Sequence, residues 1–128
     1  MATLKAANIK PGTTPLLTVV VDGEAIQNAT IYVTINMGDR QLTKSNYNGN
    51  DAVMAEAIYD SYRYRQQTGT QVYVQLSQAD TLCLRPGNAR LEIGWIFEDG
   101  TADKADIGRI EITDTLYRGV MAYGGRSS

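Results

Sequence analysis

A strict alternation of apolar and polar residues from Ala89 to Glu98 constrains the fold of this chain more than any other feature. Successive side chains of a β-strand point to opposite faces, so this segment predicts a strand with one apolar and one polar face. The pair Asp99-Gly100 follows, and Asp-Gly is typical of a two-residue type I′ turn, which predicts a hairpin with a partner strand at about 105–113. The inward face would carry Ala89, Leu91, Ile93, Trp95 and Phe97.

Turn residues divide the rest of the chain into short segments with a similar pattern. Strands are expected at 16–21, 30–37, 40–44, 71–76 and 81–85. Residues 52–59 contain helix-forming residues without an apolar stripe, so a short helix and an irregular excursion both fit there. About seven short strands separated by turns are typical of an all-β protein, and we expect an antiparallel immunoglobulin-like β-sandwich.

The length of 128 residues predicts a single domain, residues 1–128, with two arms. Residues 1–12 end at the breaker Pro11-Gly12 and are expected to form an N-terminal arm. Residues 118–128 are rich in glycine but include Val120, Met121 and Tyr123. A free tail is the ordinary interpretation of such an end, and the mixture also suits a C-terminal arm that docks on a neighbouring subunit.

The residue types needed for most catalytic and metal sites are missing from the sequence. The chain has no histidine and one cysteine, Cys83, which excludes catalytic triads with histidine and the usual zinc motifs. Cys83 lies between two leucines and is expected to be a half-buried core residue. We expect no enzyme activity, no cofactor and no metal, although a calcium loop through Asp99, Asp103 and Asp106 stays open.

Charge and hydropathy exclude two further classes of partner. The net charge of −2 and the pI of about 5.0 argue against nucleic acid, which basic surfaces bind. No run of about 20 apolar residues is available to span a membrane. The first residues lack the apolar core of a signal peptide, so synthesis in the cytoplasm without export is expected.

Residues 47–68 concentrate tyrosine and arginine, the side chains that protein interfaces favour. If the segment is a long insertion loop, it is a candidate contact for a protein or a glycan. If it is a strand, its tyrosines would simply cover the edge of the core. Together with the C-terminal arm, the candidate interface residues are Tyr47, Tyr59, Tyr62, Arg63, Tyr64, Arg65, Val120, Met121 and Tyr123.

Four short motifs stand out along the chain: Gly-Thr-Thr-Pro at 12–15, Leu-Ser-Gln-Ala-Asp-Thr-Leu at 76–82, Asp-Gly-Thr-Ala at 99–102 and Leu-Tyr-Arg-Gly-Val-Met at 116–121. With these motifs the chain resembles small virion structural proteins of tailed bacteriophages and prophages. The match spans most of the chain outside about 50–68. None of these motifs is catalytic, so the resemblance transfers no functional residue.

The resemblance implies a non-enzymatic virion protein of the tail, the baseplate or the head, as an accessory or fibre-anchoring subunit. Its partners would be other virion proteins and further copies of itself, and it would be made in the cytoplasm of the host bacterium. The alternative is a carbohydrate-binding or host-attachment module in which Trp95 or the tyrosines stack on sugars. Trp95 shares the predicted face of Leu91 and Ile93, which favours a core position for it.

Overall fold

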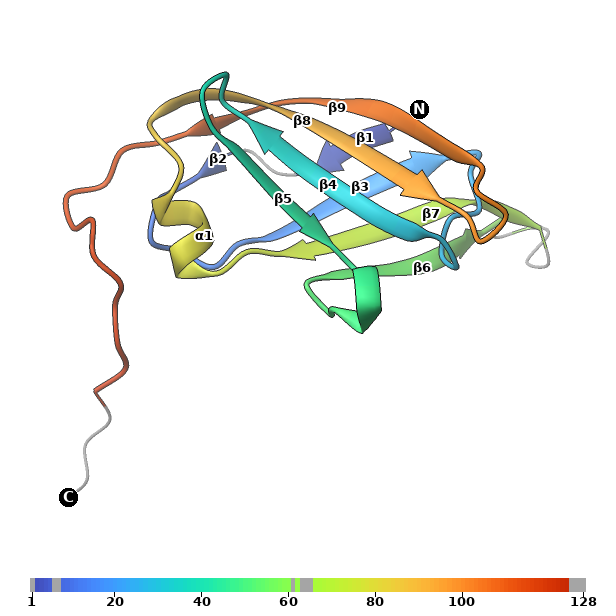
Figure 1. The fold of residues 1–128 in the computed structure, drawn as a ribbon, viewed down its shortest axis with the longest axis horizontal. Helices are drawn as coiled ribbons and strands as arrows, with labels where there is room; N and C mark the ends of the chain where they lie inside the picture. The colour runs from blue at the N-terminus through green and yellow to red at the C-terminus, as the bar shows by residue number, and fades with distance from the viewer. Residues whose placement is uncertain (1, 6–7, 61, 63–65, 125–128) are drawn as a thin grey trace.

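The structure, a computed structural model, describes residues 2–5, 8–60, 62 and 66–124. Within these residues nine strands form two sheets, with one 3₁₀ turn and one short α-helix (Figure 1). The first sheet has the order β1 (Ala2–Lys5), β3 (Leu16–Asp22), β7 (Gln67–Gln75), β6 (Val53–Tyr59). The second has the order β2 (Asn8–Ile9), β9 (Ala102–Ile112), β8 (Gly87–Ile96), β4 (Thr30–Asn36), β5 (Gln41–Ser45).

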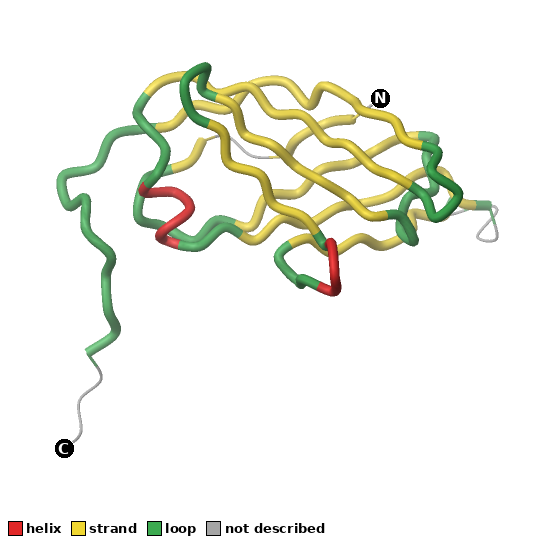
Figure 2. The backbone as a smooth tube through the Cα atoms, viewed as in Figure 1, coloured by secondary structure: helices red, strands yellow, loops and turns green. Residues whose placement is uncertain are grey.

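Apolar residues from both sheets form a common core, and strands are the main regular element of the described backbone (Figure 2). The expectation of a β fold is confirmed at this level. The described strands outnumber the expected seven, and β2 pairs with β9 in parallel, so the second sheet is mixed rather than antiparallel. Core residues on alternating strand positions include Leu17, Val19, Val21, Ile31, Val33, Ile35, Val72, Val74, Leu91, Ile93, Ile110 and Ile112.

The predicted hairpin of 89–98 with 105–113 is confirmed as β8 and β9. Trp95 is 5% exposed and belongs to the core, as its place in the alternation indicated. The connection is a three-residue loop instead of a type I′ turn: the Gly100 N–H donates to the Phe97 carbonyl, and Gly100 has a φ of 90°. A turn followed by a left-handed glycine closes such a loop with only one positive φ.

A bulge in β9 adjusts which side chains reach the core. The register shifts where Leu91 faces Gly108 and Glu92 faces Asp106, and Gly108 has a φ of 109°. Ile107 and Ile110 are both buried although they lie an odd number of residues apart. The extra residue in the bulge resets the alternation, which lets both isoleucines point inward.

Residues 2–5 and 8–9 form strands, so the expected N-terminal arm at 1–12 is wrong. β1 pairs with β3 and β2 pairs with β9, so the chain contributes an edge strand to each sheet. Ile9 is 1% exposed, and its carbonyl accepts a hydrogen bond from the Thr113 N–H. Burial of Ile9 and pairing of its backbone hold the segment against the body.

The strand predicted at 81–85 is also wrong, because α1 (Gln78–Leu82) occupies this region. The helix begins with a capping box: the Ser77 hydroxyl accepts from the Asp80 N–H, and the Asp80 carboxylate accepts from the Ser77 N–H. This reciprocal pair satisfies backbone donors that a helix start leaves free. Cys83 follows the helix and is exposed, so its expected place in the core is wrong as well.

The expected insertion at 47–68 belongs to the sheet. A 3₁₀ turn, η1 (Tyr47–Gly49), leads into β6, which pairs along its length with β7. Residues 52–59 form neither a helix nor a long loop. Val53–Tyr59 is a strand, in which Val53 and Ala55 point toward the core and Met54 and Glu56 point outward. Among the described residues of 47–68, residues 53–59 form the edge strand β6 and residues 67–68 begin β7.

Candidate interaction surface

The chain leaves the body after β9 as an extended C-terminal arm, residues 113–124 in the described part of the chain (Figure 1). Within these residues five large apolar side chains are exposed. Monomeric proteins seldom leave so many apolar groups uncovered on one short segment. The five are Leu116, Tyr117, Val120, Met121 and Tyr123.

The arm is attached to the body through α1. The Gln78 side chain donates to the Met121 carbonyl at 2.9 Å and accepts from the Met121 N–H at 2.7 Å. One amide thus pairs with both backbone groups of a residue, as a neighbouring strand would. Closer to the body, Arg118 forms an ion pair with Asp114 at 2.6 Å. These contacts hold the arm's backbone and leave its apolar side chains exposed.

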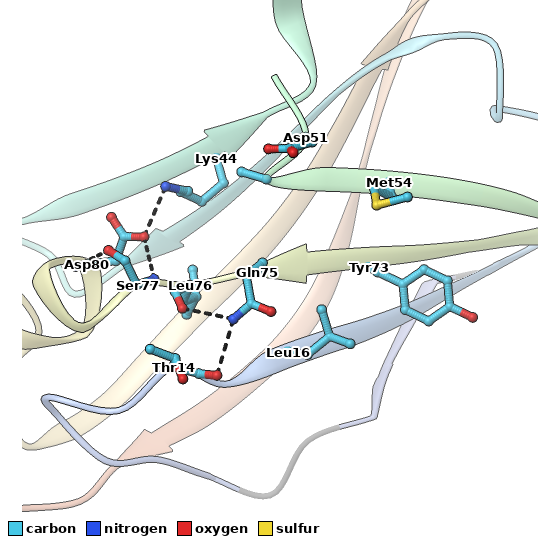
Figure 3. Close-up of a pocket in the computed structure, with 11 residues that line it drawn as sticks. Thr14, Leu16, Lys44, Asp51, Met54, Tyr73, Gln75, Leu76, Ser77 and Asp80 are labelled. Atoms are coloured by element: carbon cyan, nitrogen blue, oxygen red, sulfur yellow. Dashed lines mark hydrogen bonds and ion pairs between the residues drawn. The ribbon is translucent and has the colours of Figure 1, made fainter. Parts of the chain in front are cut away.

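A groove of about 750 Å³ lies where the outer face of the first sheet meets α1 and the end of β5 (Figure 3). Its apolar part comes from Leu16 on β3, Met54 on β6 and Tyr73 on β7. Met54 lies directly opposite Tyr73 on the neighbouring strand and is 61% exposed. Leu16 is also exposed. The groove is therefore an open surface with an apolar floor. Its remaining lining residues are Thr14, Lys44, Asp51, Ala52, Gln75, Leu76, Ser77 and Asp80.

One end of the groove is built around the carboxylate of Asp80. Lys44, on β5, forms an ion pair with it at 2.9 Å, and the Ser77 N–H donates to it at 2.8 Å. Partial burial acts to raise the pKa of Asp80, but the hydrogen bonds from Ser77 and Lys44 outweigh it and the pKa is lowered. Asp80 is therefore ionised at neutral pH and links α1 to the second sheet.

Tyr73 is held in place at the other end of the groove. Its hydroxyl donates to Glu56 Oε1 at 2.8 Å. This hydrogen bond to a carboxylate, with some desolvation, raises the pKa of Tyr73. The Tyr73 side chain is thus neutral, and its hydroxyl's hydrogen bond to Glu56 fixes its orientation. Its apolar ring is well suited to an interface.

The structure separates the tyrosines that the sequence grouped together. Tyr47 is exposed in η1, whereas Tyr59 and Tyr62 are exposed at the β6–β7 turn. β6 spans seven residues, which at about 3.3 Å per residue puts these two groups about 20 Å apart. Arg63, Tyr64 and Arg65 lie outside the described residues. Of the candidate residues, Val120, Met121 and Tyr123 share one segment, and they lie at the α1 end of the molecule.

The groove residues Leu16, Met54 and Tyr73 were missed as candidates by reasoning from the sequence. Each occupies an outward position of its strand, a signal that alternation could have supplied. Their neighbourhood depends on strand pairing, with Tyr73 opposite both Thr18 and Met54. No local pattern relates positions so far apart in the chain.

The acidic residues considered for calcium lie in and after the β8–β9 loop. Asp99 and Asp106 accept from the backbone N–H groups of Thr101 and Gly108, and each has a lowered pKa mainly for that reason. Among the described residues, no three acidic or thiol side chains gather as a metal-ion cluster.

Within the described residues, no helix has the length and apolar character to cross a membrane.

The arm and the groove both adjoin α1, through Gln78 for the arm and through Ser77 and Asp80 for the groove. An exposed apolar segment and an apolar receiving surface are the two complementary parts of a docking contact.

The chain matches no protein-family model, and it has no significant match among curated proteins.

Proposed function

We propose that this protein is a non-enzymatic structural subunit that assembles through its C-terminal arm. The proposal rests on the exposed apolar side chains of the arm. The body does not need them for its own core, which other apolar residues already form. The resemblance to virion proteins suggests the setting: the tail, baseplate or head of a tailed bacteriophage, with other virion proteins as partners. The host cytoplasm would then be the place of synthesis.

Apolar burial supplies the driving force for such an assembly. Burying one Val, Leu or Met side chain contributes about 1.5–3 kcal/mol, so a few arm residues together can outweigh the entropy lost when the arm is ordered. The two-sheet body would act as the rigid support, as an immunoglobulin-like module does. The alternative of a glycan-binding module would depend on the exposed tyrosines alone, because Trp95, the other stacking residue considered for it, is buried.

Removal of the arm tests this proposal directly. A chain that ends at Thr113 keeps the hydrogen bond from Thr113 to Ile9 but lacks every exposed apolar residue of the arm. We expect the full chain to form a discrete oligomer and the shortened chain to be a monomer with an unchanged circular dichroism spectrum. Light scattering over a wide concentration range measures the mass of both. An oligomer that persists without the arm would contradict the proposal.

A further inference from the structure

We propose that the groove between α1 and β6 receives the C-terminal arm of a second copy of this chain, and that two copies exchange their arms reciprocally. This inference rests on the proposed function of the arm as an assembly element, and it adds the identity of the partner and the receiving site. The groove is defined by Leu16, Met54 and Tyr73 with α1 at one end.

The arm and the groove match in chemistry. Residues 119–124 of the arm, Gly-Val-Met-Ala-Tyr-Gly, carry no charged side chain. The apolar floor of the groove would cover Val120, Met121 or Tyr123 without burying a charge, which would be costly. Of the charged lining residues, Lys44 and Asp80 neutralise each other at 2.9 Å, and Asp51 is exposed to solvent, so the apolar floor itself carries no charge. Binding an uncharged, apolar segment therefore costs the least desolvation free energy at this surface.

The arm cannot fill its own groove in the conformation that the structure shows. Gln78 holds the Met121 backbone beside α1, and in Figure 1 the arm leads away from both sheets. Tyr123 is 97% exposed. The arm's apolar side chains are therefore presented to another molecule, and the groove of the same chain stays open for one.

The position of the groove favours a closed pair over an open filament. Ser77 and Asp80, which line the groove, lie within one helical turn of Gln78, which holds the arm. Donor and acceptor surfaces thus adjoin each other at one end of the molecule. When both lie on one patch, a twofold axis lets each copy give and receive an arm at the same interface, and association stops at two copies.

The experiment compares variants of the groove and of the arm by light scattering and sedimentation. Met54→Asp puts a charge on the groove floor, and Ile96→Asp is its control, because Ile96 is a 40% exposed residue on the outer face of the other sheet. Both side chains are exposed, so both variants are expected to fold, which circular dichroism checks. We expect Met54→Asp to weaken dimerisation by about 30-fold or more, and Ile96→Asp by less than about threefold.

Mixing variants then identifies the partner surface. The chain ending at Thr113 has a groove but no arm, and Met54→Asp has an arm but a blocked groove. We expect each alone to be largely monomeric, and the mixture to form a heterodimer that is weaker than the native dimer, because one of the two dockings remains. Such rescue requires that an arm from one copy enters the groove of another.

Three other outcomes distinguish the proposed function of the arm from the proposed receiving groove. If loss of the arm abolishes assembly while Met54→Asp does not, the arm is an assembly element but this groove is not its receptor, which overturns the inference alone. If the full chain is monomeric at every concentration, exchange between copies is overturned, and assembly through the arm would need a different protein. If the oligomer survives without the arm, both proposals fail.

Discussion

Gly108 shows how one residue controls which side chains of β9 reach the core. Its φ of 109° is in a region that L-residues with a Cβ rarely adopt, and the bulge there turns both Ile107 and Ile110 inward. An added Cβ would meet no atom within 4 Å, so a substitution is opposed by backbone strain and not by a clash. We expect Gly108→Ala to lower the free energy of unfolding by about 1–3 kcal/mol, measured by urea denaturation.

Arg109→Ala is the matched control, because Arg109 is the exposed neighbour of Gly108 in the same strand. We expect it to change the free energy of unfolding by less than about 0.5 kcal/mol. Equal effects of the two substitutions would mean that the bulge does not depend on glycine.

Helix α1 is short, and its stability comes from its N-terminal contacts. Asp80 accepts from the Ser77 N–H and pairs with Lys44, so Asp80→Ala removes half of the capping box and an ion pair together. We expect a loss of about 1–2 kcal/mol in the free energy of unfolding, since a cap contributes about 1 kcal/mol and a partly exposed ion pair less. Asp51→Ala, at an exposed carboxylate of the same groove, is the control and should cost little.

The same contacts predict a pH dependence for α1. The pKa of Asp80 is lowered in the folded protein, so its contribution is fully present above the ordinary carboxyl value of 3.8 and is lost as the pH falls through the lower, folded value. We expect the stability difference between the native chain and Asp80→Ala to shrink on acidification below that range. Urea denaturation at several pH values measures it, and a constant difference would contradict the ion-pair and cap account.

At the scale of the whole molecule, residues 2–5 and 8–9 take part in both sheets. β1 and β2 are edge strands of different sheets, and Ile9 is buried in the common core. We expect Ile9→Ala to lower the free energy of unfolding by about 2–4 kcal/mol, because it opens a cavity in the core. Leu16→Ala, at an exposed position, should cost under about 1 kcal/mol in the same urea titration. Similar costs would show that the N-terminal segment does not support the core.

Regular alternation was enough to place β4 and β8 and their faces. Ile31, Val33 and Ile35 on β4, and Leu91, Ile93 and Trp95 on β8, are buried as their spacing predicted. Alternation is read from neighbouring residues, so each of these strands carries its own evidence. The β8–β9 hairpin followed for the same reason, because its two strands and its turn are adjacent in the chain.

Tertiary structure decided the shortest strand and the interaction surface. β2 has two residues and α1 has five, too few to establish a period. β2 forms because Ile9 is buried in the core, whereas α1 begins with the local Ser77–Asp80 capping box and is tied to the second sheet by the ion pair of Asp80 with Lys44. Likewise, Met54 and Tyr73 face each other only because β6 pairs with β7 in one register. The sequence by itself determined the inward and outward faces of the regularly alternating strands, such as β4 and β8, because those faces depend only on the backbone of the strand. Which outward faces meet in a groove depends on contacts between residues far apart in the chain, and those form only in the folded molecule.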